Sequence, residues 1–313
     1  MKEVLVISEI HDRMQQSLER IEGYQFHFYA NFFEVPNELK EKIEIYIGAP
    51  KKEEVDELPN LKWVQLVFAG ANTYGWLQED ILLSNAKGGY GKGIAEHMLG
   101  ITLMAEKYFL SYYDQQKENQ WKPIPEVKLI SEAKILSVGM GDIGSEYLKR
   151  CHMLGATCFG VRRNKHEKPD YVEALYTMNE LDEILPECDV VALSLPETNE
   201  TKQLFDLERL RKMKKDAILI NVGRGSAIVE KDLLTVLKEG YFHLVALDVC
   251  EIEPLPQNNP LWNADRVFIT PHISGRFTSV ANYKNVMKVI CDNLENYLKE
   301  DRPKYLVNRK LGY

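Results

Sequence analysis

The stretch between residues 134 and 270 constrains the fold more than any other part of the chain. Six apolar runs recur there with helix-compatible segments between them, and they show almost no polar alternation. Such runs are typical of strands that are covered on both faces, as in a parallel sheet. We predict strands at 135–138, 157–161, 190–195, 217–222, 244–249 and 267–270. The stretch is therefore predicted to form an α/β unit built on a parallel sheet.

The first of these strands leads directly into a glycine pattern, Gly139-x-Gly141-x-x-Gly144. The spacing alone is a weak signal, but the strand before it and the helix-compatible stretch after it strengthen the prediction. Gly139 permits a tight turn, Gly141 lets the backbone approach a pyrophosphate, and Gly144 lets the helix pack on the strand. Asp142 and Ile143 begin that helix, whose N-terminus would face the phosphates. The alternative is a glycine-rich turn that binds no ligand.

The end of the second predicted strand indicates which dinucleotide is bound. A site that uses NAD normally has an acidic residue there, which holds the ribose 2′-hydroxyl. This chain instead has Arg162 and Arg163, and no carboxylate. A guanidinium binds a 2′-phosphate through charge-assisted hydrogen bonds. The sequence therefore predicts NADPH/NADP⁺ as the cofactor, with NADH/NAD⁺ as the weaker alternative; a solvated basic turn would be the structural alternative.

Polar side chains follow three further predicted strands, at the point where each strand ends. Arg224 follows one, Asp248 lies at the end of the next with Glu253 after it, and His272 follows the last. Open α/β sheets bind ligands at this edge. Reduction of a carbonyl needs an anion clamp, a proton donor and a positioned hydride. Each residue alone has an ordinary structural explanation, but the three strand ends together favour an active site.

In this order the motifs GxGxIG, NxGRG, DVxxxEP and TPHxxG resemble those of the D-isomer-specific 2-hydroxyacid dehydrogenases. The resemblance covers nearly all of the chain and includes GIAEH at 93–97 and LPETNET at 195–201. It implies that Arg224 binds the substrate carboxylate and polarises the carbonyl oxygen. It also implies that His272 binds the substrate and donates a proton to that oxygen. The same resemblance gives Glu253, rather than Glu251, the role of orienting the imidazole and favouring its charged form.

The resemblance implies further contacts to substrate and cofactor. Backbone amides of the loop Ala69-Gly70-Ala71 would grip the substrate carboxylate, although the family commonly has Val-Asp where this chain has Ala71-Asn72. Asp248 would lie near the nicotinamide carboxamide. The remaining expected cofactor contacts are Leu195, Pro196, Thr201, Val222, Gly223 and Gly275.

The expected architecture is α/β, with two Rossmann-like domains, one flavodoxin-like and one dinucleotide-binding. Both would have parallel sheets, and the active site would lie in the cleft between them. The first hundred residues also alternate short strands with helix-like segments; we predict strands at 4–8, 26–29, 43–47 and 64–68. Residues 1–97 plus 284–313 would form the substrate-binding outer domain, and 98–283 the NAD(P)-binding domain. A single long helix is predicted over 93–119, and the family resemblance implies a homodimer.

Three details resemble the glyoxylate/hydroxypyruvate reductase branch: the short chain, the Arg162-Arg163 pair and the segment WKPIP at 121–125. The predicted function is NADPH-preferring reduction of a small 2-oxo acid, of the glyoxylate, hydroxypyruvate or pyruvate type, to the 2-hydroxy acid. One alternative is a dehydrogenase of the same fold with a different hydride donor, phosphite or formate. Formate dehydrogenases have glutamine where this chain has Glu253. A nucleotide-sensing interaction protein is the alternative from another functional class.

The composition excludes several other classes of partner. The net charge of −8 at pH 7 argues against broad binding to nucleic acid or anionic lipid. The five cysteines are scattered, without CxxC spacing, as expected of reduced thiols rather than of disulfides or a metal site. No apolar run approaches the roughly 20 residues of a membrane span. We therefore predict a cytoplasmic protein with no metal, membrane or nucleic-acid partner.

Overall fold

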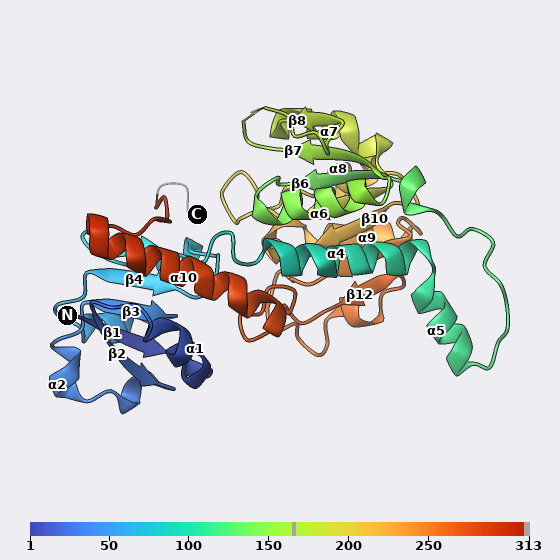
Figure 1. Cartoon of the computed structure of the whole chain (residues 1–313). Helices are drawn as coiled ribbons and strands as arrows, with labels where there is room; N and C mark the ends of the chain where they lie inside the picture. The colour runs from blue at the N-terminus through green and yellow to red at the C-terminus, as the bar shows by residue number, and fades with distance from the viewer. Residues whose placement is uncertain (165–166, 310–313) are drawn as a thin grey trace. The chain divides into compact units, whose positions relative to one another are not determined.

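The computed structural model describes residues 1–164 and 167–309, and the chain divides into two compact units (Figure 1). One unit comprises residues 1–90 and 276–313, and the other comprises residues 91–275. The expected domain bounds, 97/98 and 283/284, lie a few residues further along the chain, and the roles assigned to those domains stay predictions. Residues 310–313, which the sequence assigns to the outer domain, lie outside the described residues.

The first unit is built on a five-stranded parallel sheet in the order β2-β1-β3-β4-β5, the flavodoxin-like order. Its interior strands β3 and β4 are buried along their whole length, which explains their continuous apolar sequence. The C-terminal helix α10 packs on this sheet, with the Tyr297 ring 4.8 Å from the Trp63 ring. The strands are β1 (Lys2–Ile7), β2 (Tyr24–Tyr29), β3 (Ile45–Gly48), β4 (Trp63–Leu66) and β5 (Leu82–Ser84), and the helices are α1 (His11–Leu18), α2 (Asn37–Lys40), α3 (Lys52–Asp56) and α10 (Val280–Glu300).

The second unit is built on a seven-stranded parallel sheet in the order β12-β11-β10-β9-β6-β7-β8. The direction of winding reverses between β6 and β9, and ligands of open α/β sheets bind at such a switch point. The strands are β6 (Lys134–Val138), β7 (Thr157–Val161), β8 (Ala174–Tyr176), β9 (Val190–Leu193), β10 (Ile218–Asn221), β11 (Leu244–Leu247) and β12 (Val267–Ile269). The helices are α4 (Gly91–Glu106), α5 (Phe109–Lys117), α6 (Asp142–Met153), α7 (Leu181–Ile184), α8 (Leu207–Lys212) and α9 (Glu230–Lys238). The predicted fold class, two Rossmann-like units with parallel sheets, is confirmed.

The prediction of a single helix over 93–119 is wrong, because the helix is interrupted between α4 and α5. Tyr108 has a φ of +56°, in the left-handed region, and it separates the two helices. The carbonyl oxygen of Ala105 contacts His243 Nε2 at 2.8 Å, and the Tyr108 ring lies 4.4 Å from the His243 ring. These contacts to a distant residue stabilise a break that the local sequence does not signal. Two short strands, β5 and β8, were also missed.

In the described part of the chain, no helix is both long enough and apolar enough to cross a membrane.

Candidate functional site

The glycine turn after β6 has the geometry that a dinucleotide needs. Gly139 has a φ of +99°, and a Cβ there would lie 2.9 Å from the carbonyl oxygen of Ser194. At Gly144 a Cβ would lie 2.0 Å from the carbonyl oxygen of Gly139, so α6 packs against the turn more closely than a side chain allows. At Gly141, by contrast, an added Cβ would meet no atom within 4 Å. Two glycines therefore shape the turn, and the third leaves its backbone open to a ligand.

The N-terminus of α6 lies directly at this turn. Gly141 is its N-cap residue and supplies no side-chain acceptor for the first amides of the helix. Those amides and the helix dipole attract anions, so the turn fits a pyrophosphate. The backbone of Asp142 and Ile143 forms the first turn, while the Asp142 carboxylate accepts a hydrogen bond of 2.7 Å from the amide of Gly91, the first residue of α4. The Asp142 carboxylate thus joins the first residues of two packed helices.

The segment after β9 forms a folded loop beside the turn. Thr201 is buried, and its hydroxyl donates to the carbonyl oxygen of Pro196 at 2.7 Å. Leu195 is buried against Gly139, and a Cβ at Gly223 would lie 2.7 Å from the backbone N and O of Leu195. The loops after β6, β9 and β10 are therefore in close contact. Val222 joins the same region through its amide, which donates to Leu193 at 3.1 Å.

The two arginines after β7 differ in their surroundings. Arg162 is half-buried, and its Nε is fully buried without a hydrogen-bond partner among the described residues. A buried donor without an acceptor is costly, and it suits an anionic ligand. Arg163 is exposed and forms an ion pair with Glu200, with 2.9 Å between Nη2 and Oε2. Glu200 is therefore a carboxylate near the end of β7 that counting along the sequence did not find.

Arg224 follows β10 in a loop that the strand's last residue organises. Asn221 is fully buried; its amide group donates to the carbonyl oxygen of Arg224 at 2.9 Å and accepts from the amide of Gly223 at 3.1 Å. A Cβ at Gly225 would lie 1.9 Å from the carbonyl carbon and oxygen of Cys250. The loop that carries Arg224 thus packs backbone to backbone on the loop after β11.

Asp248, at the end of β11, organises the loop after β12. Its carboxylate is buried and accepts hydrogen bonds from the Thr270 hydroxyl at 2.6 Å, from the amide of Ile273 at 2.9 Å, and from the amide and hydroxyl of Ser274. Its carbonyl oxygen accepts from the amide of His272 at 2.9 Å. The segment 270–274 is therefore wrapped around one carboxylate, next to Gly275, the last residue of this unit.

His272 and Glu253 form a directly bonded pair. His272 Nδ1 lies 2.7 Å from Glu253 Oε2, and the other oxygen of Glu253 accepts from the amide of Cys250 at 3.0 Å. Because a carboxylate only accepts, Nδ1 carries a proton, and Nε2 is the nitrogen that can exchange one with a ligand. The His272 side chain is 50% exposed.

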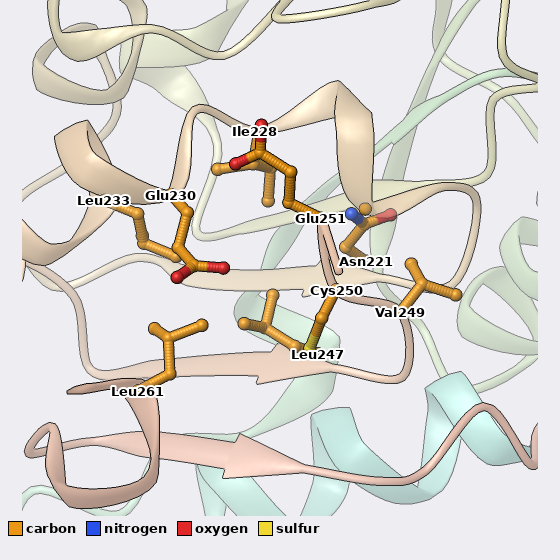
Figure 2. Close-up of a pocket in the computed structure, with 10 residues that line it drawn as sticks. Asn221, Ile228, Glu230, Leu233, Leu247, Val249, Cys250, Glu251 and Leu261 are labelled. Atoms are coloured by element: carbon orange, nitrogen blue, oxygen red, sulfur yellow. The ribbon is translucent and has the colours of Figure 1, made fainter. Parts of the chain in front are cut away.

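A small cavity lies beside the loops after β10 and β11, and Arg224, Glu253 and His272 do not line it (Figure 2). Its volume of about 10 Å³ holds a single water molecule at most. Figure 2 shows side chains of β10, β11, α9 and the loops between them gathered around it, including Glu251 and Cys250. Burial raises the pKa of the Cys250 thiol to about 11, so it stays protonated at neutral pH. The cavity is part of the packing that supports the loops, and it has no room for a substrate.

The remaining predicted substrate contacts lie in the first unit, after β4. Ala71 is buried, and the carbonyl oxygen of Ala69 accepts from the Asn85 side chain at 2.5 Å. The loop is thus held by its own unit. Its backbone role toward a substrate remains a prediction.

Sequence reasoning missed several residues that build the site. Thr270 and Ser274 fasten the His272 loop to Asp248, and His97 Nε2 lies 3.5 Å from the Thr270 hydroxyl. Burial lowers the pKa of His97, opposed by the charge of Asp248. Hydroxyl side chains two residues before and two residues after His272 were a usable signal for the first two, since Ser and Thr hydroxyls can donate to a carboxylate. The contact of Glu200 with Arg163 could be found only from the order of the strands in the sheet.

Known proteins resemble the chain along most of its length. Residues 99–274 match the family model described as D-isomer specific 2-hydroxyacid dehydrogenase, NAD binding domain. Glyoxylate/hydroxypyruvate reductase B of Enterobacter sp. (strain 638) is 32% identical over 263 residues, which are 81% of this chain and 80% of that protein.

Two solved structures share the fold. A D-isomer specific 2-hydroxyacid dehydrogenase family protein from Aeromonas salmonicida has a TM-score of 0.90 at 27% identity, covering 98% of this chain and 99% of its own. A D-isomer specific 2-hydroxyacid dehydrogenase from Xanthobacter autotrophicus Py2, solved with NADPH and MES, has a TM-score of 0.87 at 23% identity, covering 100% and 99%. The stretch matched by the family model includes the glycine turn, Arg224, Glu253 and His272.

Proposed function

The chain belongs to the D-isomer specific 2-hydroxyacid dehydrogenases, and from that premise we propose that it reduces a small 2-oxo acid with a preference for NADPH. As a member of this family it is an NAD(P)-dependent oxidoreductase that acts on the CH–OH group of 2-hydroxy acids. The observation that carries the proposal is the His272–Glu253 pair, 2.7 Å apart, whose His272 side chain is half-exposed. It supplies the proton donor that reduction of a carbonyl requires.

Each polar residue of the site has a defined role in this proposal. Arg224 binds the substrate carboxylate and polarises the carbonyl oxygen. His272, as imidazolium, delivers its Nε2 proton to that oxygen, and Glu253 stabilises the charged ring through Nδ1. In the oxidative direction neutral His272 accepts the proton from the hydroxyl group. The bound nicotinamide would supply the hydride for reduction and accept it in oxidation. The backbone amides of Ala69–Ala71, in the first unit, would donate to the substrate carboxylate.

The preference for NADPH is supported by the end of β7. Arg162 offers a buried Nε without a partner in the described residues, and Arg163 adds a second guanidinium. A 2′-phosphate satisfies such donors, whereas a 2′-hydroxyl supplies no compensating charge. The Xanthobacter structure was solved with NADPH, which agrees with this choice. The pyrophosphate is expected to contact the turn from Gly139 to Gly144.

The proposed substrates are glyoxylate and hydroxypyruvate, because the Enterobacter relative is named for them. The test is oxidation of NADPH and of NADH with glyoxylate, hydroxypyruvate, pyruvate and phenylpyruvate in turn. We expect turnover with the small acids, at a higher kcat/KM with NADPH than with NADH. No turnover with any of them, while NADPH still binds, would contradict the proposal and favour another hydride donor or a nucleotide sensor.

We also propose a homodimer formed through α5 and the loop that follows it. Figure 1 shows this segment standing away from the sheet of the second unit. Its exposed side chains include Phe109, Tyr113 and Trp121, which are 58%, 56% and 99% exposed. Trp121 also lines a groove of about 660 Å³, together with Tyr112, Pro123 and five polar side chains. Apolar surface of this kind is typical of protein interfaces.

We propose a cytoplasmic location as well, because the cysteines are scattered and unpaired.

A further inference from the structure

An ion pair crosses the cofactor end of the sheet in the second unit. Arg163 follows β7 and Glu200 follows β9, and these two strands lie on opposite sides of β6. The glycine turn begins where β6 ends. The 2.9 Å contact between Arg163 and Glu200 therefore bridges the edge of the sheet at which the winding direction reverses, above the strand that leads to the phosphate-binding turn.

The two arginines of this edge thus have different electrostatic surroundings. The Arg162 Nε is buried and has no acceptor within the described residues, whereas the Arg163 guanidinium already binds a carboxylate. The Arg163 side chain is 39% exposed and that of Glu200 is 68% exposed, so water can reach the pair. An exposed pair of this kind exchanges partners readily because its net stabilisation is small.

We propose that Glu200 is a specificity-determining residue that weakens the preference for NADPH by competing with the 2′-phosphate for Arg163. The inference rests on the proposed use of Arg162 and Arg163 for NADPH. A carboxylate and a phosphate bind the same donors of a guanidinium, so one displaces the other. NADH carries a neutral 2′-hydroxyl at this position and has no anion that would compete. Glu200 therefore lowers the affinity for one cofactor and leaves the other unchanged.

The test is the Kd of NADPH and of NADH for the full-length protein and its Glu200→Gln variant, measured by titration of nicotinamide fluorescence at one fixed ionic strength. Because exposed ion pairs contribute little, the expected effect is a decrease of roughly two- to fivefold in the NADPH Kd. The NADH Kd should not change. Glu200→Ala should give the same result. The matched control is Glu239→Gln, which breaks the exposed Arg211–Glu239 pair elsewhere in the unit and should change neither Kd.

A second set of variants separates competition from simple repulsion. When Arg163→Gln is already present, Glu200→Gln should no longer tighten NADPH binding, because the shared guanidinium is gone. Tightening that persists without Arg163 would overturn the competition and indicate repulsion between Glu200 and the phosphate. An unchanged NADPH Kd in the single Glu200 variants would also overturn it. Weaker NADH binding would do so as well, since Glu200 would then hold the ribose hydroxyl.

Failure of this inference is distinguishable from failure of the proposed function. If Arg162→Ala leaves both Kd values unchanged and the wild-type protein binds NADH as tightly as NADPH, the proposed NADPH preference is wrong. If Arg162→Ala weakens NADPH binding but Glu200→Gln has no effect, only the role of Glu200 is wrong.

Discussion

His272 adopts a backbone φ of +50°, in the left-handed region that few residues other than glycine and asparagine enter. Its amide lies 2.9 Å from the carbonyl oxygens of both Asp248 and Thr270, and these contacts stabilise the turn. The turn in turn directs Nδ1 to Glu253. The position of the proposed proton donor is thus fixed by backbone contacts as well as by its carboxylate partner.

A substitution at His272 should therefore separate chemistry from binding. Loss of a general acid typically costs 10²–10⁴-fold, so we expect kcat for the 2-oxo acid to fall by roughly this factor in His272→Asn. Asparagine tolerates the left-handed conformation, so the loop should keep its fold. The NADPH Kd, measured by fluorescence titration, should stay at the wild-type value. His272→Ala should lose activity likewise. Loss of NADPH binding in both variants would indicate a structural histidine instead.

Arg162 provides the second test at this scale. Arg162→Ala removes the guanidinium whose Nε is buried without a partner in the described part of the chain. A charge-assisted hydrogen bond contributes about 1.5–3 kcal/mol, so the KM for NADPH should rise by at least about tenfold. The KM for NADH should change far less, since its ribose carries no phosphate. Equal changes in both KM values would contradict the assignment of this residue to the 2′-phosphate.

At the level of elements, the loops after β10 and β11 act as one body. The carbonyl group of Cys250 occupies the place that a Cβ of Gly225 would need. Gly225→Ala must push the Arg224 loop and the Glu253 loop apart. Overpacking of this kind costs about 1–3 kcal/mol in the free energy of unfolding, and kcat/KM should fall with it. Urea denaturation and steady-state kinetics measure the two effects.

The control for this change is Gly100→Ala in α4. No atom lies within 4 Å of a Cβ built at Gly100, which is exposed on the helix. Alanine stabilises a helix interior relative to glycine by about 0.5–1 kcal/mol, so this variant should be as stable as the wild-type protein or more stable. If Gly225→Ala were as stable and as active as the wild-type protein, the close contact between the two loops would not contribute to stability or function.

The elements also show what a sequence can and cannot predict. The turn at Gly139 was predictable, because only glycine readily adopts its positive φ between a strand and a helix. The break at Tyr108 was not, since it depends on His243, far along the chain. The pair of Arg163 and Glu200 depends on β7 and β9 flanking β6, which no local pattern specifies. A local backbone requirement can be predicted from the sequence, whereas a contact that depends on strand order cannot.

For the whole molecule, the test is its state of association. Exposed aromatic side chains on α5 and the following loop lose contact with water in the proposed dimer. Tyr113→Ser combined with Trp121→Ser should raise the dimer dissociation constant by at least about tenfold, since aromatic anchors typically contribute 2 kcal/mol or more. Sedimentation equilibrium measures this constant. The control is Phe33→Ser in the first unit, where the side chain is 81% exposed. A wild-type protein that sediments as a monomer would contradict the dimer.

The bond between Asp142 and Gly91 has a consequence for how such a chain can evolve. Gly91 is where the backbone enters the second unit, and Ser274, held by Asp248, lies one residue before it leaves. At both positions where the chain passes between the units, a carboxylate of the second unit thus accepts hydrogen bonds from the passing segment. The backbone geometry at the two ends of the second unit therefore does not depend on the segments joined to them. We expect residues 91–275 to keep the dinucleotide turn when recombination joins them to a foreign outer unit.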